Sequence, residues 1–137
     1  MFQALHDAVY VAALLPVVAV AWRYRSLPPT IPLSFLPNGR PIAYGPRWLL
    51  LATSALVAVV LPLAALALHA PGAHVPRTGT GWVLIYLVLI ETPVFVAALL
   101  ALEADVALGK RALLPPTLMW GGTAVILITA GAAAFAR

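Results

Sequence analysis

A single carboxylate, Glu91, lies in the middle of a long apolar segment of this sequence. No other charged residue occurs between Trp82 and Leu102. An ionisable side chain at the centre of a bilayer costs roughly 2.5–3.5 kcal/mol on insertion scales, and such residues often have a function. Pro93 leaves a helix carbonyl without its usual donor, and Thr92 carries a hydroxyl beside it. Glu91, Thr92 and Pro93 therefore form a candidate intramembrane polar or proton site.

Three interpretations of Glu91 follow from its chemistry. As a neutral carboxyl it would hydrogen-bond a neighbouring helix and fix the helix register. As a titrating group it would relay a proton or a cation, and as a charged group it would pair with a partner subunit. The hydroxyl groups that could bond it, if their helices face it, belong to Thr92, Tyr86, Thr53, Ser54, Thr123 and Thr129.

Histidines are the other side chains with metal or proton chemistry. His6, His69 and His74 all fall on one side of the membrane if the chain crosses it four times, as does Asp7. Imidazoles and a carboxylate are common ligands of transition metals. Because nothing in the sequence brings the rings within bonding distance, we expect no metal and no cofactor. A site built from His6, His69 and His74 is kept as an alternative.

The segments that must position these residues are long and apolar. Of the 137 residues, 64% are hydrophobic and 9% are charged, and the mean hydropathy is +1.03. About 17–25 residues are needed to cross a bilayer as a helix. The segments of that length are approximately 5–22, 48–68, 82–102 and 113–135.

The predicted fold is all-α. Only helices and closed barrels satisfy their backbone in lipid, and these segments lack the alternation of barrel strands. We expect an integral membrane four-helix bundle, with residues 1–137 as a single membrane domain. A long proline-rich, non-helical loop, 23–47, joins the first two helices. The first segment lacks a preceding Lys or Arg, which favours a retained helix over a signal peptide.

Prolines and small residues suggest how the helices pack. Pro62 and Pro93 are expected to kink the second and third helices, and Pro115 and Pro116 fit the start of the fourth. The fourth helix is rich in Gly and Ala, which let helix backbones approach closely in lipid. We expect this helix to pack within the bundle, with homodimerisation as the alternative.

Basic residues concentrate in the first and third loops. The positive-inside rule then places the Arg-rich loop in the cytoplasm and both termini outside, in a multi-pass membrane protein. We expect no nucleic-acid partner, because the charges are spread over loop ends. Glu103 and Asp105 are expected in a solvated loop with local ion pairs to Lys110 and Arg111. The basic residues of the first and third loops are Arg23, Arg25, Arg40, Arg47, Lys110 and Arg111.

The first loop has a recognisable pattern. Its prolines exclude a long helix, and Asn38-Gly39 is a strong turn signal. We therefore expect an extended, turn-linked segment that lies at the membrane interface or caps the bundle. Its Pro and Gly spacing is carried by Leu27, Pro28, Ile31, Pro32, Phe35, Gly39, Pro41, Tyr44, Gly45 and Arg47.

These residues resemble the motif of a bacterial membrane family, domain of unknown function 1648. That family includes the SdpI-type toxin-immunity and signalling proteins. Ser34 and Ile42 stand where the family motif has a histidine and an aspartate. The resemblance implies the helical membrane fold around this loop, a location in the bacterial cytoplasmic (inner) membrane, and an immunity-like or signal-sequestering activity.

No arrangement of residues predicts an enzyme. Cysteine is absent, which excludes thiolate metal sites and cysteine nucleophiles, and Ser34 has no nearby base. We expect a small accessory protein that acts by protein–protein contact in the bilayer, through a partner protein or as a homo-oligomer. The alternatives are an accessory transmembrane subunit of a larger respiratory or photosynthetic complex and a proton-coupled carrier that uses Glu91.

Overall fold

The computed structural model describes residues 2–70 and 79–136. Each of its four helices is long and apolar enough to cross a membrane, which confirms the prediction of a multi-pass membrane protein. The elements in chain order are α1 (Phe2–Tyr24), β1 (Thr30–Phe35), β2 (Pro41–Pro46), α2 (Trp48–Ala67), α3 (Gly79–Ala107) and α4 (Pro116–Phe135).

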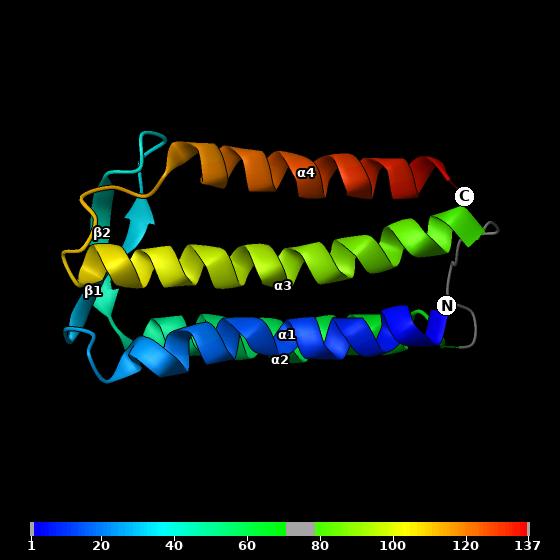
Figure 1. Cartoon of the computed structure of the whole chain (residues 1–137), viewed down its shortest axis with the longest axis horizontal. Coiled ribbons are helices and arrows are strands. Elements are labelled where there is room, and N and C mark those ends of the chain that lie inside the picture. The colour runs from blue at the N-terminus through cyan, green and yellow to red at the C-terminus, as the bar shows by residue number, and fades with distance from the viewer. Residues whose placement is uncertain (1, 71–78, 137) are drawn as a thin grey trace.

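The four helices lie side by side along one direction, with the two strands at one end (Figure 1). Helix α3 lies between α4 on one side and the α1–α2 pair on the other. Helix α4 packs mainly on α3, and 6% of its most apolar stretch is buried, against 28% in α1. The bundle is therefore a three-helix core, α1 to α3, with α4 added along one edge.

The core is centred on α1. Its buried residues recur every three or four positions, at Val9, Ala12, Ala13, Pro16 and Val20. This spacing places them on one face of a helix. In lipid, close packing of small residues is a main source of helix association, and the two alanines let α2 and α3 approach α1.

The segment between α1 and α2 differs from the prediction. It was expected as a non-helical loop with an extended, turn-linked chain. Its residues 30–46 form a two-stranded antiparallel sheet, so the fold is not purely all-α. The register pairs Thr30 with Pro46 and Phe35 with Pro41, with irregularities around Ser34. Proline is tolerated here because both strands of a two-stranded sheet are edges, where a missing N–H breaks no ladder. The prolines exclude a helix without excluding a hairpin.

The hairpin segment packs against the ends of α1, α2 and α3. Leu27 and Ile31 are buried in a cluster with Val20 of α1, Leu50 of α2 and Leu100 of α3. This apolar cluster closes one end of the three-helix core. The predicted turn at Asn38-Gly39 is confirmed by the bond from the Gly39 N–H to the Leu36 carbonyl, 2.8 Å.

Helix α3 is longer than predicted and includes both acidic residues that were expected in a loop. Glu103 and Asp105 lie in its last turns. Asp105 pairs with Arg23 of α1, 3.6 Å from carboxylate oxygen to Nε, so the ion pair joins two helices. Neither predicted local pair, to Lys110 or Arg111, is formed by the Asp105 side chain among the described residues. A charged residue can be part of the last turn of a membrane helix when an opposite charge on a neighbouring helix pairs with it. The length of the apolar segment alone does not predict such a pair.

Candidate functional site

Glu91 lies in the middle of α3, on the face turned away from α1. Tyr86 packs with Val9 of α1, and this marks the face of α3 that meets α1. Glu91 follows Tyr86 by five positions, about 140° further round the helix. It lies one turn before Phe95, whose ring contacts Gly122 of α4. Glu91 therefore belongs to the α4-facing side of α3.

The carboxylate of Glu91 has an unpaired atom. Its Oε2 is buried and has no hydrogen-bond partner among the described residues. Helix α4 runs antiparallel to α3, so the α4 residue near the level of Glu91 is one turn after Gly122, at Ile126. That side chain has no polar atom. A buried polar group without a partner costs about 1–3 kcal/mol.

The hydroxyl groups that could have bonded Glu91 are engaged elsewhere. Thr92 donates to the Val88 carbonyl of its own helix, 2.8 Å. The hydroxyls of Thr53, Ser54, Thr123 and Thr129 likewise donate to carbonyls three or four residues earlier, and Tyr86 bonds histidines.

The three residues of the predicted intramembrane site do not share one environment. The Thr92 hydroxyl is turned to its own backbone, and Pro93 is fully buried. Helices α2 and α3 both continue through their prolines, Pro62 and Pro93. Only Glu91 presents unused hydrogen-bonding capacity, so the candidate site reduces to this carboxyl and the α3–α4 face around it.

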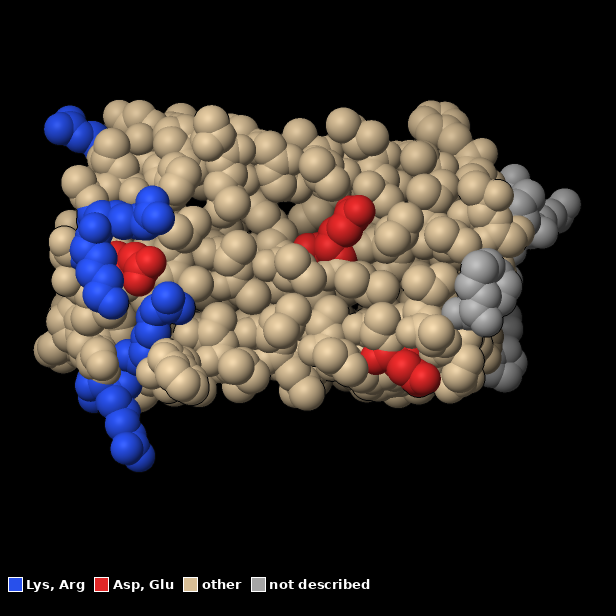
Figure 2. Space-filling view, in the orientation of Figure 1, with Lys and Arg blue, Asp and Glu red and all other residues tan. Residues whose placement is uncertain are grey.

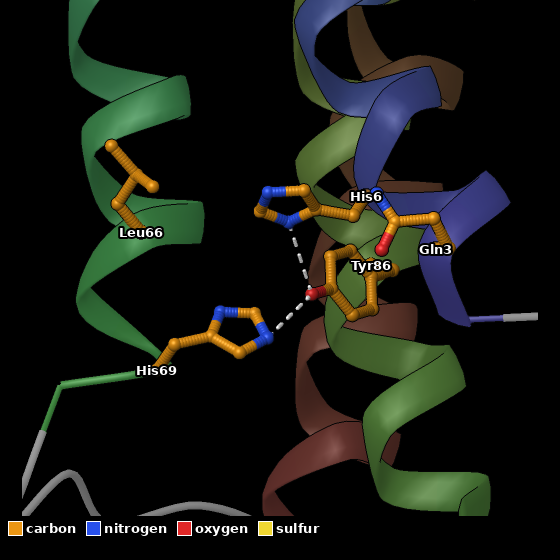
Figure 3. A pocket seen from close by; sticks show the side chains of 5 residues that line it. All are labelled: Gln3, His6, Leu66, His69 and Tyr86. Carbon is orange, nitrogen blue, oxygen red and sulfur yellow. Dashed lines mark hydrogen bonds between the residues drawn. The ribbon is translucent and has the colours of Figure 1, made fainter.

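A second polar cluster lies at the end of the bundle opposite the hairpin, where α1, α2 and α3 meet. The Tyr86 oxygen is 3.3 Å from His6 Nδ1 and 3.5 Å from His69 Nε2 (Figure 3). The two imidazole rings lie edge to face, with centroids 5.3 Å apart. The side chains of Gln3 and Leu66 complete the lining of a pocket of about 290 Å³.

The hydrogen atoms in this cluster can be assigned from one contact. His69 Nδ1 is 3.1 Å from the Ala65 carbonyl, which has no hydrogen to give, so this nitrogen is the donor. In a neutral ring, His69 Nε2 is then an acceptor, and the Tyr86 hydroxyl donates a hydrogen bond to it. His6 Nδ1 in turn donates to the Tyr86 oxygen. The result is a chain from α1 through α3 to α2.

The cluster gathers two of the three histidines that the sequence placed on one side. His74 lies outside the described residues. Within the described residues no group of three or more His, Cys, Asp or Glu side chains is placed to hold a metal. Tyr86 was expected as a possible partner of Glu91, and its contact with the histidines was not predicted. Its position about one turn after Trp82, at the helix end nearest His69, is the signal that was available.

The residues of the predicted loop motif have structural roles. Arg47 donates from Nη1 to the Leu27 carbonyl, 2.9 Å, and its guanidinium lies 4.9 Å from the centre of the Tyr24 ring. Leu27 and Ile31 are buried. The motif therefore holds the hairpin to the ends of α1 and α2, while Tyr44 on the outer surface is 61% exposed.

The basic side chains gather at the hairpin end of the molecule. On the face in view, Figure 2 shows the described Lys and Arg side chains at that end and none along the helices beyond it.

Comparisons with known proteins gave no match. No family model, no curated protein and no solved structure matched this chain. The resemblance of the hairpin motif to a membrane family stays a prediction.

Proposed function

We propose that this chain is an accessory membrane protein that binds a partner protein within the bilayer, through the α3–α4 face around Glu91. The occupant of this face is a transmembrane helix of another protein that carries a hydrogen-bond donor near the centre of the membrane. The unpaired buried Oε2 of Glu91 is the observation that supports the proposal.

The chemistry of Glu91 defines the partner's side chain. A carboxylate accepts hydrogen bonds, so Lys, Arg, Asn, Gln, Ser or Thr of the partner would match it. The chain's own hydroxyls near the centre of the bundle are bonded to their own helices or to histidines. A second copy of this chain would bring a second Glu91, and two carboxylates repel each other unless protonated. A different protein therefore matches this face better than a second copy.

The weak burial of α4 is consistent with a partner at this edge. Helix α4 is held mainly by α3. Val94, on the turn of α3 that follows Glu91, is 47% exposed. In the membrane, a partner helix beside Val94 would cover apolar surface and meet the half-buried Glu91 side chain at the same time.

The test compares two substitutions of Glu91. Glu91→Gln keeps the side-chain shape and one acceptor oxygen, whereas Glu91→Leu removes both acceptors. Stoichiometric co-purification of the partner in mild detergent should survive Glu91→Gln at reduced strength. Glu91→Leu should reduce it at least tenfold, because about 1.4 kcal/mol corresponds to a factor of ten. Unchanged co-purification with Glu91→Leu contradicts the proposal.

The same pair of variants separates the alternative functions. A proton-coupled carrier needs a titrating group, so Glu91→Gln would abolish proton flux in reconstituted vesicles while leaving any complex intact. A subunit of a respiratory or photosynthetic complex would co-migrate with cofactor-bearing proteins. The hairpin motif favours an accessory protein of the immunity-like or signal-sequestering kind. Such a protein would instead co-purify with one partner protein that carries no cofactor.

The orientation that fits this function places the hairpin in the bacterial cytoplasm. The gathering of Lys and Arg at the hairpin end supports it through the positive-inside rule. The chain termini and the His6–Tyr86–His69 cluster would then lie at the outer face of the cytoplasmic membrane.

A further inference from the structure

We infer that His6, His69 and Tyr86 form a binding site for a divalent transition-metal ion of the zinc or copper class. The ligand atoms are His6 Nδ1, His69 Nε2 and the Tyr86 oxygen. This site lies at the end of the bundle opposite the hairpin and is independent of the Glu91 face.

The spacing of the ligand atoms fits a metal better than it fits strong hydrogen bonds. The Tyr86 oxygen is 3.3 Å and 3.5 Å from the two histidine nitrogens. Hydrogen bonds in proteins are usually shorter, about 2.7–3.2 Å for an N–H donor and an oxygen acceptor. Two ligands of a tetrahedral ion at metal–nitrogen distances of about 2.0–2.1 Å are separated by about 3.3–3.4 Å. The 3.3 Å separation matches this value, and the 3.5 Å separation is slightly longer.

The separation of the two imidazole rings agrees with the same geometry. A ring centroid lies about 1.1–1.2 Å behind its ligating nitrogen, so two tetrahedral imidazole ligands have centroids about 5.2 Å apart. The rings of His6 and His69 are 5.3 Å apart. One ion would draw together His6 Nδ1 and His69 Nε2, which approach the Tyr86 oxygen from different directions (Figure 3).

The outer hydrogen bonds are those of metal-ligating side chains. Metal-bound histidines usually donate their second N–H to a carbonyl or a carboxylate, which fixes the ring. His69 Nδ1 does this to the Ala65 carbonyl, 3.1 Å, which leaves Nε2 directed at Tyr86. Gln3 lines the pocket and donates its Nε2 to Asp7, 3.3 Å, so its amide oxygen remains for a fourth ligand position. Water in the pocket could occupy the same position.

Binding of the metal ion changes the protonation of Tyr86 and His6. Tyr86 loses its hydroxyl proton to solvent when it binds the ion, and the Nδ1 proton of His6 moves to Nε2 of the same ring. One proton is released for each ion bound, so affinity should weaken as the pH falls. Imidazole and phenolate ligands suit Zn²⁺ and Cu²⁺, whereas Mg²⁺ and Ca²⁺ prefer carboxylate and carbonyl oxygens.

The test is metal titration of the full chain in detergent micelles, purified through a tag that contains no histidine. Zn²⁺ binding is followed by calorimetry, and Cu²⁺ binding by the nitrogen hyperfine structure of its electron paramagnetic resonance spectrum. We expect one ion per chain, a spectrum with two imidazole nitrogens, and no binding of Mg²⁺. A spectrum without two imidazole nitrogens, or no binding of either ion, overturns the inference even without any variant.

Variants assign the ligands. His6→Gln and His69→Gln should each weaken Zn²⁺ binding at least about tenfold, the loss that even outer-shell changes cause. Tyr86→Phe keeps the ring and should weaken binding and abolish proton release. His74→Gln is the control and should leave binding unchanged. Loss of binding in His74→Gln together with retention in His6→Gln and His69→Gln overturns the assignment.

Discussion

Gly39 connects two parts of the chain that are distant in sequence. Its φ of +81° favours glycine. A Cβ at this position would run into the Leu114 carbonyl, and the Leu114 N–H donates to the Gly39 carbonyl, 3.0 Å. The hairpin turn therefore fits against the connection between α3 and α4 only when this residue has no side chain.

Gly39→Ala should lower the free energy of unfolding in detergent more than Gly109→Ala does. Gly109 also has a positive φ, +70°, but open space where its Cβ would be. Gly109→Ala should thus show the backbone cost alone, about 1–2 kcal/mol. Gly39→Ala adds the collision with Leu114, a further ~1–3 kcal/mol. Thermal unfolding followed by circular dichroism measures both, and equal losses would contradict the contact.

Glu91 illustrates the limit of reading chemistry from sequence. The isolated carboxyl is evident in the apolar segment, and so are the hydroxyls that could bond it. Which of them it meets depends on how each helix is rotated about its axis, and nearly featureless apolar helices do not encode that rotation visibly. The structure shows the hydroxyls turned to their own backbones and Glu91 Oε2 without a partner in the described residues.

Helix α4 packs mainly along α3, and Trp120 Nε1 at its start donates to the Pro37 carbonyl of the hairpin turn, 3.4 Å. Gly122 meets the ring of Phe95, whereas Gly121 beside it faces open space. The prediction that small residues of this helix serve packing is supported at Gly122. It does not apply to Gly121 or Gly131, which contact nothing at the Cβ position.

Gly122→Val should push α4 away from α3 and destabilise the protein by about 1–3 kcal/mol, the usual cost of overpacking. Gly121→Val, the adjacent control, makes no such contact and should change stability by much less. Thermal unfolding in detergent compares the two variants. Equal stability of Gly122→Val and Gly121→Val would show that α4 does not pack through this position.

The helices were predictable from the sequence, whereas the hairpin was predicted only as an extended chain with a turn and without its strand pairing. Segment length and hydropathy give the spans, because a bilayer requires a fixed length of apolar helix. The prolines of residues 23–47 exclude a helix, yet they permit strands that are both edges of a sheet. The C-terminal end of α3 was predicted too early for a different reason. Asp105 lies within the helix, where it pairs with Arg23 of α1.

Charge and apolar surface together define how the protein lies in a membrane. The described Lys and Arg side chains lie at the hairpin end (Figure 2), and the helices are covered by exposed apolar residues such as Leu56, Leu127 and Ile128. In a soluble protein so many exposed large apolar side chains would promote aggregation. In lipid they are the expected surface, and the charged end anchors the orientation.

Single cysteines test the orientation without background, because the chain contains none. Asn38→Cys lies in the hairpin turn and Ala70→Cys follows α2 at the other end. In intact bacterial spheroplasts, a membrane-impermeant maleimide should label Ala70→Cys and leave Asn38→Cys unlabelled until the membrane is opened. The reverse pattern would place the hairpin outside the cell.

Photo-crosslinking in native membranes tests the binding proposal most directly. A photoreactive residue at Val94, next to Glu91, is compared with one at Val59 on α2, since the two side chains are 47% and 56% exposed. Position 94 should give one discrete adduct with a different protein, absent at position 59 and lost when Glu91→Leu is added. The same adduct with Glu91→Leu, adducts only between copies of this chain, or none at position 94 would contradict the account.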